Sequence, residues 1–124
     1  MSRCSLVLIL ATLALVSRPA SALDCANAMS TIDMLQCADR DYQAADKRLN
    51  QSYSAFKKTL DAEGAKLLLE SQRAWLKFRD TNCAVAADMA RGGTLSPLLN
   101  LGCQADMTEK RNKELIEFAK GMAQ

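Results

Sequence analysis

The sequence predicts an all-α fold, a small three-helix domain with a long antiparallel helical hairpin, stapled by two disulfides. After residue 22, apolar side chains recur at three- and four-residue steps almost to the end of the chain. Two segments that carry glycine, 61–64 and 91–97, interrupt this spacing. No stretch alternates as a half-buried strand would. We therefore expect three helices joined by short connections.

The first 22 residues have the features of a signal peptide that is cleaved after Ala22. Arg3 supplies the positive start, residues 6–16 are apolar, and residues 20–22 form an A-x-A cleavage signal. The apolar run is shorter than a membrane span, which takes about 20 residues. We expect residues 23–124 to form one domain, periplasmic or secreted, with no membrane span after cleavage.

The predicted mature domain is electrically neutral and holds no histidine. Without Arg3 and Arg18, 14 Lys and Arg face 14 Asp and Glu, so nothing indicates nucleic acid or an anionic membrane as a partner. The absence of histidine removes Ser-His and Cys-His nucleophilic sites and imidazole metal ligands. We expect a protein that is not an enzyme, uses no cofactor or metal and binds a protein partner. The oligomeric state stays open.

Four cysteines of the mature domain predict two disulfides, because export places them in an oxidising compartment. These are Cys25, Cys37, Cys83 and Cys103. None of them forms a C-x-x-C pair, which disfavours a metal or redox-active site.

A first helix is predicted over 31–60, a segment without Pro or Gly. Ser30 can cap its N-terminus, and Asp33 favours the positive end of the helix dipole. Its apolar stripe consists of Met34, Ala38, Tyr42, Ala45, Leu49, Tyr53, Phe56 and Leu60.

A second helix is predicted from Asp61, which can cap it, to about Ala90. It contains Trp75, the sole tryptophan of the sequence, and Phe78. Its apolar residues cover so wide an arc that we expect more than one partner to enclose it. We therefore predict this helix to be the central one of the domain.

Because the connection between them is short, the first two helices should form an antiparallel hairpin whose facing residues have numbers that sum to about 123. This register places Cys37 near Cys83, so Cys37–Cys83 with Cys25–Cys103 is the preferred disulfide pairing. The alternative is Cys25–Cys83 with Cys37–Cys103. The sequence does not decide between them, since four cysteines allow three connectivities.

The same register brings polar residues of the two helices together. Asp46 is expected to pair with a partly buried Arg79, and Asn50 falls near Arg73. We favour a structural network between the helices over a binding groove, because Arg and Asp are seldom buried unpaired. The network consists of Asp46, Asn50, Gln72, Arg73, Trp75 and Arg79.

Ser96 is predicted to cap a third helix whose first position is Pro97. Within it, Gly102 can introduce a kink, and Thr108 can start a separate final helix.

The connection before the third helix is the candidate binding loop, because loops on a rigid scaffold often carry binding. It offers one cation, two glycines and two hydroxyls, and the alternative is a plain connection. The candidate residues are Arg91, Gly92, Gly93, Thr94 and Ser96.

Cysteines, aromatic residues and arginines form a spaced pattern over nearly the whole predicted mature domain. The pattern consists of Cys25, Cys37, Tyr42, Asp46, Asn50 and Tyr53, the run 72–80 with Cys83, and Gly92, Gly93, Thr94, Cys103, Thr108, Arg111 and Leu115. In these residues the chain resembles the LprI-like lysozyme-inhibitor family. The resemblance implies a small secreted or periplasmic bacterial domain that binds a lysozyme or a related cell-wall hydrolase. A non-catalytic interaction module of the envelope is the alternative function.

Overall fold

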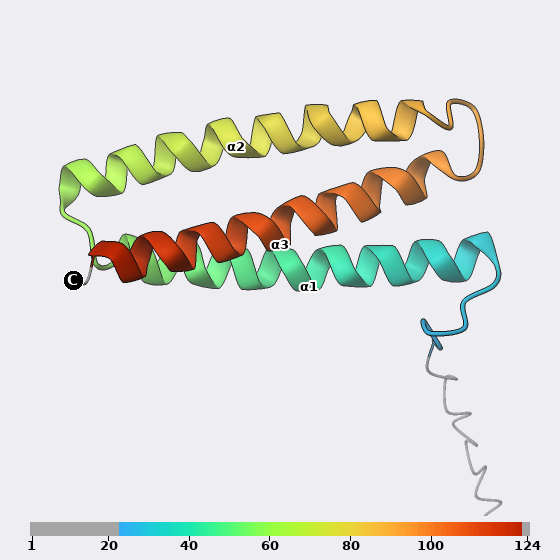
Figure 1. Ribbon diagram of the computed structural model, residues 1–124, viewed down its shortest axis with the longest axis horizontal. Coiled ribbons are helices and arrows are strands. Elements are labelled where there is room, and N and C mark those ends of the chain that lie inside the picture. The colour runs from blue at the N-terminus through green and yellow to red at the C-terminus, as the bar shows by residue number, and fades with distance from the viewer. Residues whose placement is uncertain (1–22, 123–124) are drawn as a thin grey trace, which may run out of the picture.

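The computed structural model describes residues 23–122, which form three helices of 27 residues each (Figure 1). They are α1 (Thr31–Lys57), α2 (Ala62–Asp88) and α3 (Ser96–Met122). Each is about 40 Å long at 1.5 Å per residue. The predicted all-α, three-helix fold is confirmed. The predicted signal peptide, 1–22, lies outside the described residues.

The predicted caps of the first two helices are present. The Ser30 hydroxyl accepts a hydrogen bond from the Asp33 backbone N–H at 3.0 Å, and the Asp61 carboxylate accepts one from the Gly64 N–H at 2.8 Å. Each bond satisfies a backbone donor that has no partner within the first turn. α3 begins at Ser96 and continues without a break past Gly102, so the alternative of a separate final helix from Thr108 is not realised.

The three helices are not equal neighbours. α3 lies between α1 and α2 and packs on both, whereas α1 and α2 touch each other at few points (Figure 1). The first two helices run antiparallel, as predicted. The prediction that the second helix is central is wrong, because part of its broad apolar arc faces solvent. Phe78, for example, is 58% exposed.

The apolar core occupies the end of the bundle nearest the α1–α2 connection. It is built from Leu49 and Phe56 of α1, Leu68 of α2 and Leu115 of α3. Partly buried residues pack around it: Tyr53, Leu60, Trp75 and Ala119. Leu49 of α1 and Leu68 of α2 both belong to the cluster around Leu115 of α3. Burial of this apolar surface therefore holds α1 and α2 on either side of α3.

The opposite end of the bundle carries both disulfides, in a pairing that differs from the predicted one. Cys25 bonds Cys37 with a Cα–Cα distance of 5.7 Å, and Cys83 bonds Cys103 at 5.5 Å. The predicted pairs Cys37–Cys83 and Cys25–Cys103 are wrong, and so is the alternative. These pairings assumed that the first two helices pack directly on each other. In the structure, α3 lies beside Cys83, and residues 23–30 fold back onto the start of α1.

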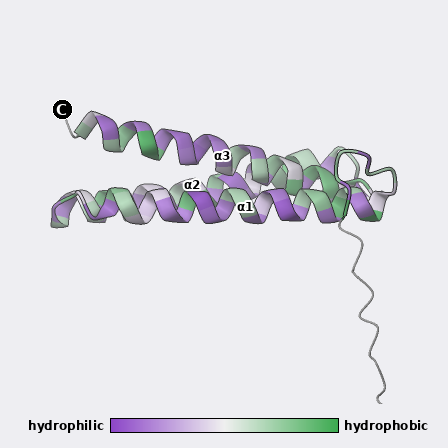
Figure 2. Ribbon diagram, turned by 90° about the horizontal axis from the view of Figure 1, so that it is seen from below, coloured by the Kyte–Doolittle hydropathy of each residue, from purple (hydrophilic) through white to green (hydrophobic). Residues whose placement is uncertain are grey.

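Hydrophilic and hydrophobic residues intermingle along all three helices (Figure 2). Within residues 23–122, no helix combines the length and the hydrophobicity that a membrane crossing requires. No cluster of three or more acidic or cysteine side chains suited to a metal ion occurs in the same part of the chain.

Candidate functional site

Two arginines from different helices lie against Trp75 in the middle of the bundle. The guanidinium carbons of Arg79 and Arg111 are 5.4 Å and 5.8 Å from the centre of its ring system, and Arg79 is also 5.4 Å from the ring of Tyr42. Both arginine side chains are buried, with 7% and 8% exposed. The electron-rich aromatic faces attract these cations in an environment with little water.

Arg79 uses its nitrogens on three partners. Its Nε and Nη2 donate to one Asp80 carboxylate oxygen at 3.0 Å and 2.8 Å. Its Nη1 donates to the Thr108 hydroxyl at 3.3 Å and lies 4.0 Å from Asp46 Oδ1. The predicted contact with Asp46 is therefore present, although the neighbouring Asp80 is the closer carboxylate.

Arg111 of α3 makes an equivalent set of bonds to α2. Its Nε donates to the Gln72 side-chain carbonyl at 3.2 Å, and its Nη2 donates to the Ser71 hydroxyl at 2.9 Å. Its Nη1 pairs with Glu114, one turn further along α3, at 3.0 Å. Since its donors are directed to protein acceptors, Arg111 holds α3 against α2.

The predicted network is brought together in part. Asn50 joins it through a 2.9 Å bond from its Nδ2 to Asp46, whereas Arg73 is exposed on the outer side of α2. Sequence reasoning missed the role of Arg111 and of Thr108. A signal for them exists, since Arg111 falls on the same helical stripe as Thr108 and Leu115, and all three are buried.

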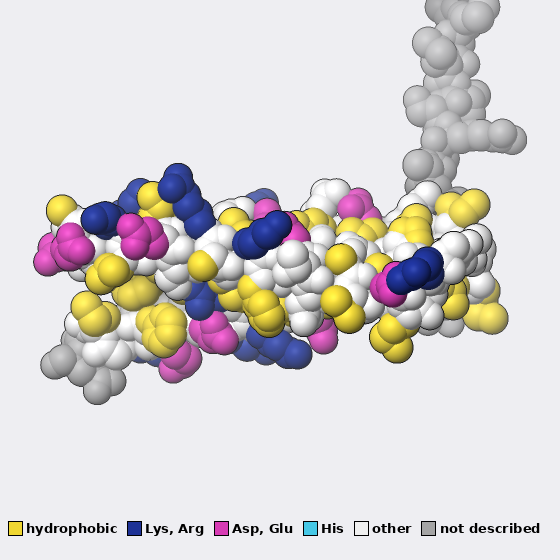
Figure 3. Space-filling view, turned by 90° about the horizontal axis from the view of Figure 1, so that it is seen from above, with side chains coloured by type: hydrophobic (Ala, Val, Ile, Leu, Met, Phe, Trp, Pro, Cys, Tyr) yellow, Lys and Arg dark blue, Asp and Glu magenta, His cyan; other side chains and the backbone are white. Residues whose placement is uncertain are grey.

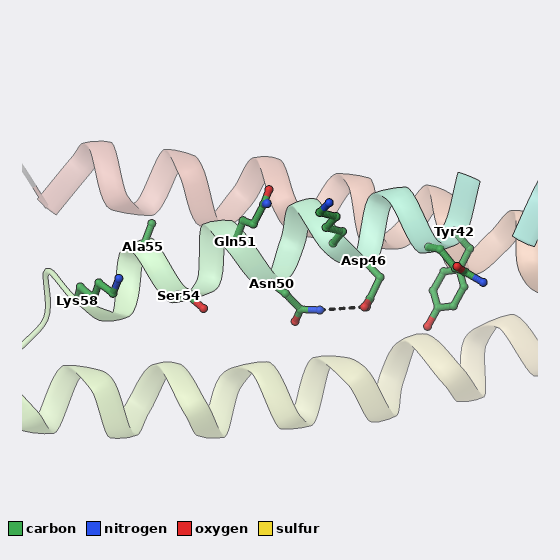
Figure 4. Close-up of a pocket in the computed structure, with 9 residues that line it drawn as sticks. Tyr42, Asp46, Asn50, Gln51, Ser54, Ala55 and Lys58 are labelled. Carbon is green, nitrogen blue, oxygen red and sulfur yellow. Dashed lines mark hydrogen bonds between the residues drawn. The ribbon is translucent and has the colours of Figure 1, made fainter. Parts of the chain in front are cut away.

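A shallow groove of about 780 Å³ runs along α1 beside this network. In Figure 4, Tyr42, Asp46 and Asn50 point from α1 toward α2, and a hydrogen bond joins the last two. Amide, hydroxyl and lysine side chains continue the lining toward Lys58. Asp46 is the one carboxylate among the described residues of this lining, so the groove has no pair for acid–base chemistry.

The candidate binding loop lies at the disulfide end, between α2 and α3 (Figure 1). Successive turns shape it: the Arg91 N–H bonds the Asp88 carbonyl at 3.1 Å, and the Gly93 N–H bonds the Ala90 carbonyl at 2.9 Å. Gly92 has a φ of 76°, a conformation that favours glycine. Residues 91–95 are all exposed. The loop thus combines a defined backbone with an open surface.

The cation of this loop is already paired. Arg91 Nε and Nη2 each donate to one oxygen of Asp88 at 2.7 Å, a two-point contact. These bonds lower the pKa of the Asp88 carboxyl and raise that of Arg91, because each charge stabilises the other. Both groups are on the surface, so the ion pair orders the loop more than it stabilises the fold.

The Cys83–Cys103 disulfide joins the two helices below this loop and encloses it in a 20-residue segment. Met107 packs beside the bond, with its sulfur 3.7 Å from that of Cys83 and 3.9 Å from that of Cys103. Asn82 donates to the same methionine sulfur at 3.3 Å. The ends of the loop are therefore held at a fixed separation.

The family model described as "Lysozyme inhibitor LprI" matches residues 24–115. That segment includes both disulfides, both buried arginines and the loop. The chain belongs to the LprI family. The chain is similar in sequence to the "Uncharacterized protein R02472" of Rhizobium meliloti (strain 1021). It is 39% identical over an alignment of 108 residues, and the match covers 77% of this chain and 78% of the relative. No solved structure matches this LprI-family chain significantly.

This LprI-family chain also exposes a row of apolar side chains on α2, here called the α2 strip. Leu67, Phe78, Val85 and Met89 are 58%, 58%, 71% and 84% exposed. Together with the exposed Ala74, they follow one another at steps of seven and four residues, which places them on one side of the helix. In the view onto α2, hydrophobic side chains extend along the molecule between charged ones (Figure 3).

Proposed function

We propose that the protein is a non-catalytic inhibitor that binds a lysozyme or a related cell-wall hydrolase outside the cytoplasm. Membership of a family described as lysozyme inhibitors supports the proposal. The observation that carries it is the α2–α3 loop, which protrudes from two long helices and is held at its base by a disulfide. A loop ordered before binding loses little conformational entropy when it enters a cleft.

The chemistry of the loop suits such a cleft. A lysozyme has two carboxyl groups beside the bond it cleaves. Arg91 already donates two hydrogen bonds to the Asp88 carboxylate, and a carboxylate of the enzyme can replace Asp88 as the acceptor. One ion pair replaces another in this exchange, so most of the affinity must come from filling the cleft. The narrow Gly92-Gly93-Thr94 tip is suited to that role.

Export to the periplasm or the medium is part of the same proposal. The predicted signal peptide over 1–22 supports it. So do the two disulfides, since such bonds persist in oxidising compartments.

A cell-wall lysis assay tests the proposal directly. Exported, oxidised protein is titrated against lysozymes of several types, and stoichiometric inhibition of at least one type is expected. The double variant Arg91→Ala with Thr94→Ala should weaken inhibition at least about tenfold, the effect of losing one central interface residue.

A matched control removes a cation and a hydroxyl at the other end of the molecule. Lys58→Ala with Ser54→Ala alters the α1 groove and leaves the loop intact. Inhibition by this variant should equal that of the unmodified protein. If instead the control loses inhibition and the loop variant keeps it, the groove is the binding site and the loop assignment is wrong.

The second candidate function is a non-catalytic interaction module of the envelope. The α2 strip favours it, because its large apolar side chains are exposed on one face of a helix, where a protein partner can cover them. Failure of the protein to inhibit lysozymes of any type, with its fold verified, would leave this function in first place.

A further inference from the structure

The α2 strip has the spacing of a helix-pairing surface. Positions 67, 71, 74, 78, 81 and 85 repeat at alternate steps of four and three, the heptad spacing of paired helices. All six residues are exposed, and none is charged: Leu67, Ser71, Ala74, Phe78, Thr81 and Val85. The row is about 27 Å long at 1.5 Å per residue. The row lies on α2, outside the proposed inhibitor loop, and it requires no lysozyme binding.

The two ends of the row have opposite shapes. At its start, a hollow of about 270 Å³ opens between α2 and α3, and its walls include Gly64, Leu67 and Phe118. At its other end, Val85 and Met89 protrude, with 71% and 84% of their surface exposed. The start of the row is therefore concave, and its other end is convex.

We propose that the α2 strip pairs with the strip of a second copy of this chain, antiparallel, about a twofold axis near residue 76. In that arrangement facing residues have numbers that sum to about 152. Val85 of each copy enters the hollow at Leu67 of the other, and Phe78 faces the small Ala74. A parallel pair would set Phe78 against Phe78 and leave both hollows empty.

Charges at the ends of α2 fit the same arrangement. Glu63 and Lys66 lie near the start of the helix, Asp88 is its last residue, and Arg91 follows it in the α2–α3 loop. An antiparallel copy brings Arg91 toward Glu63 and Asp88 toward Lys66, whereas a parallel copy opposes like charges. Lys77 lies beside the twofold axis, so the Lys77 ammonium groups of the two copies approach and repel each other. We therefore expect neutralisation of this lysine to strengthen the dimer.

The expected dimer is weak. Stable interfaces bury about 800 Å² on each partner, and a single row with three large apolar side chains covers less. Sedimentation velocity over a wide concentration range should show a monomer that converts to a dimer at high concentration. The measurement uses exported protein with both disulfides formed.

Three variants and a matched control test the face. Val85→Asp and Leu67→Asp should each weaken dimerisation at least about tenfold, because a carboxylate must be buried in the hollow or against it. Ala44→Asp adds the same charge at an exposed position of α1, away from the strip, and should leave the dimer unchanged. Lys77→Gln should tighten it. Circular dichroism melting verifies that each variant is folded.

The orientation has its own readout. A mixture of protein carrying Leu67→Cys and protein carrying Val85→Cys should yield a mixed covalent dimer on mild oxidation, while Leu67→Cys protein alone should not. A wild-type protein that stays monomeric at the highest concentration overturns the proposal and leaves the strip to a different partner. Equal loss of dimer in Ala44→Asp and Val85→Asp overturns it as well.

Discussion

Arg79 and Arg111 approach the same indole, and each reaches its carboxylate at the protein surface. The carboxylates of Asp80 and Glu114 are both 55% exposed, whereas the arginines are buried. This division lets the acids keep most of their hydration while the guanidinium groups bind aromatic faces and neutral oxygens. The three helices are thereby joined at the middle of the bundle without a fully buried ion pair.

Replacing a buried arginine should therefore cost much more than replacing an exposed one on the same helix. Arg79→Ala should lower the free energy of unfolding by about 2 kcal/mol, the value typical of lost hydrogen bonds to a charged group. Arg73→Ala, the matched control, should change it by less than about 0.5 kcal/mol. Urea denaturation of both variants measures the difference, and equal effects would contradict the structural role of Arg79.

The ion pair of the loop predicts a pH dependence at Asp88. Its pKa lies below the ordinary 3.8, because Arg91 donates two hydrogen bonds to the carboxylate. The sign follows: the pair contributes above the pKa of the unfolded state and is lost as the pH falls through the lower folded pKa. In Arg91→Ala, the Asp88 carboxyl should titrate at higher pH by NMR. An unchanged titration would mean that the pair does not form in solution.

At the scale of the elements, local rules account for the helix ends. Ser30, Asp61 and the break near Gly92 were all readable from the sequence, because a cap or a left-handed turn depends on residues within a few positions. α1 ends at Lys57 rather than at Leu60, a difference typical of helix termini. The continuity of α3 through Gly102 was less clear from sequence, since packing on both neighbours outweighs the low helix propensity of one glycine.

Two glycines should respond to alanine with opposite signs. Gly92→Ala should destabilise the protein by about 1 kcal/mol, because its φ of 76° disfavours a Cβ. Gly102→Ala should stabilise it by about 0.5–1 kcal/mol, since a Cβ there meets nothing within 4 Å and the helix gains propensity. Thermal melts of the two variants check this, and a shift in the same direction would contradict the loop conformation.

At the scale of the whole molecule, the sequence could not specify which helix lies in the middle. Helical periodicity identifies an apolar face but not the element that covers it. The antiparallel register of the first two helices holds where the long Arg79 side chain reaches Asp46. The register fails for the short cysteine side chains, because a disulfide needs Cα atoms within about 7 Å. α3 lies between α1 and α2 over most of their length, so Cys37 and Cys83 do not come that close.

The two disulfides should differ in their effect on function. Each closes a short segment, of 12 and 20 residues, so serine pairs at either site should lower stability by about 3 kcal/mol. The pair Cys83→Ser with Cys103→Ser should also weaken inhibition, because it releases the base of the loop. The pair Cys25→Ser with Cys37→Ser is the control, and the lysis assay below the melting transition separates the two effects.

Neither disulfide connects α1 with α2 or α3. The peptide backbone between Lys57 and Asp61 is therefore the sole covalent link between the first helix and the remaining two in the described part of the chain. A single tryptic cut after the exposed Lys58 would convert the protein into two chains held by non-covalent contacts alone. On a non-reducing denaturing gel these chains should run as separate fragments, whereas a Cys37–Cys83 bridge would keep them as one.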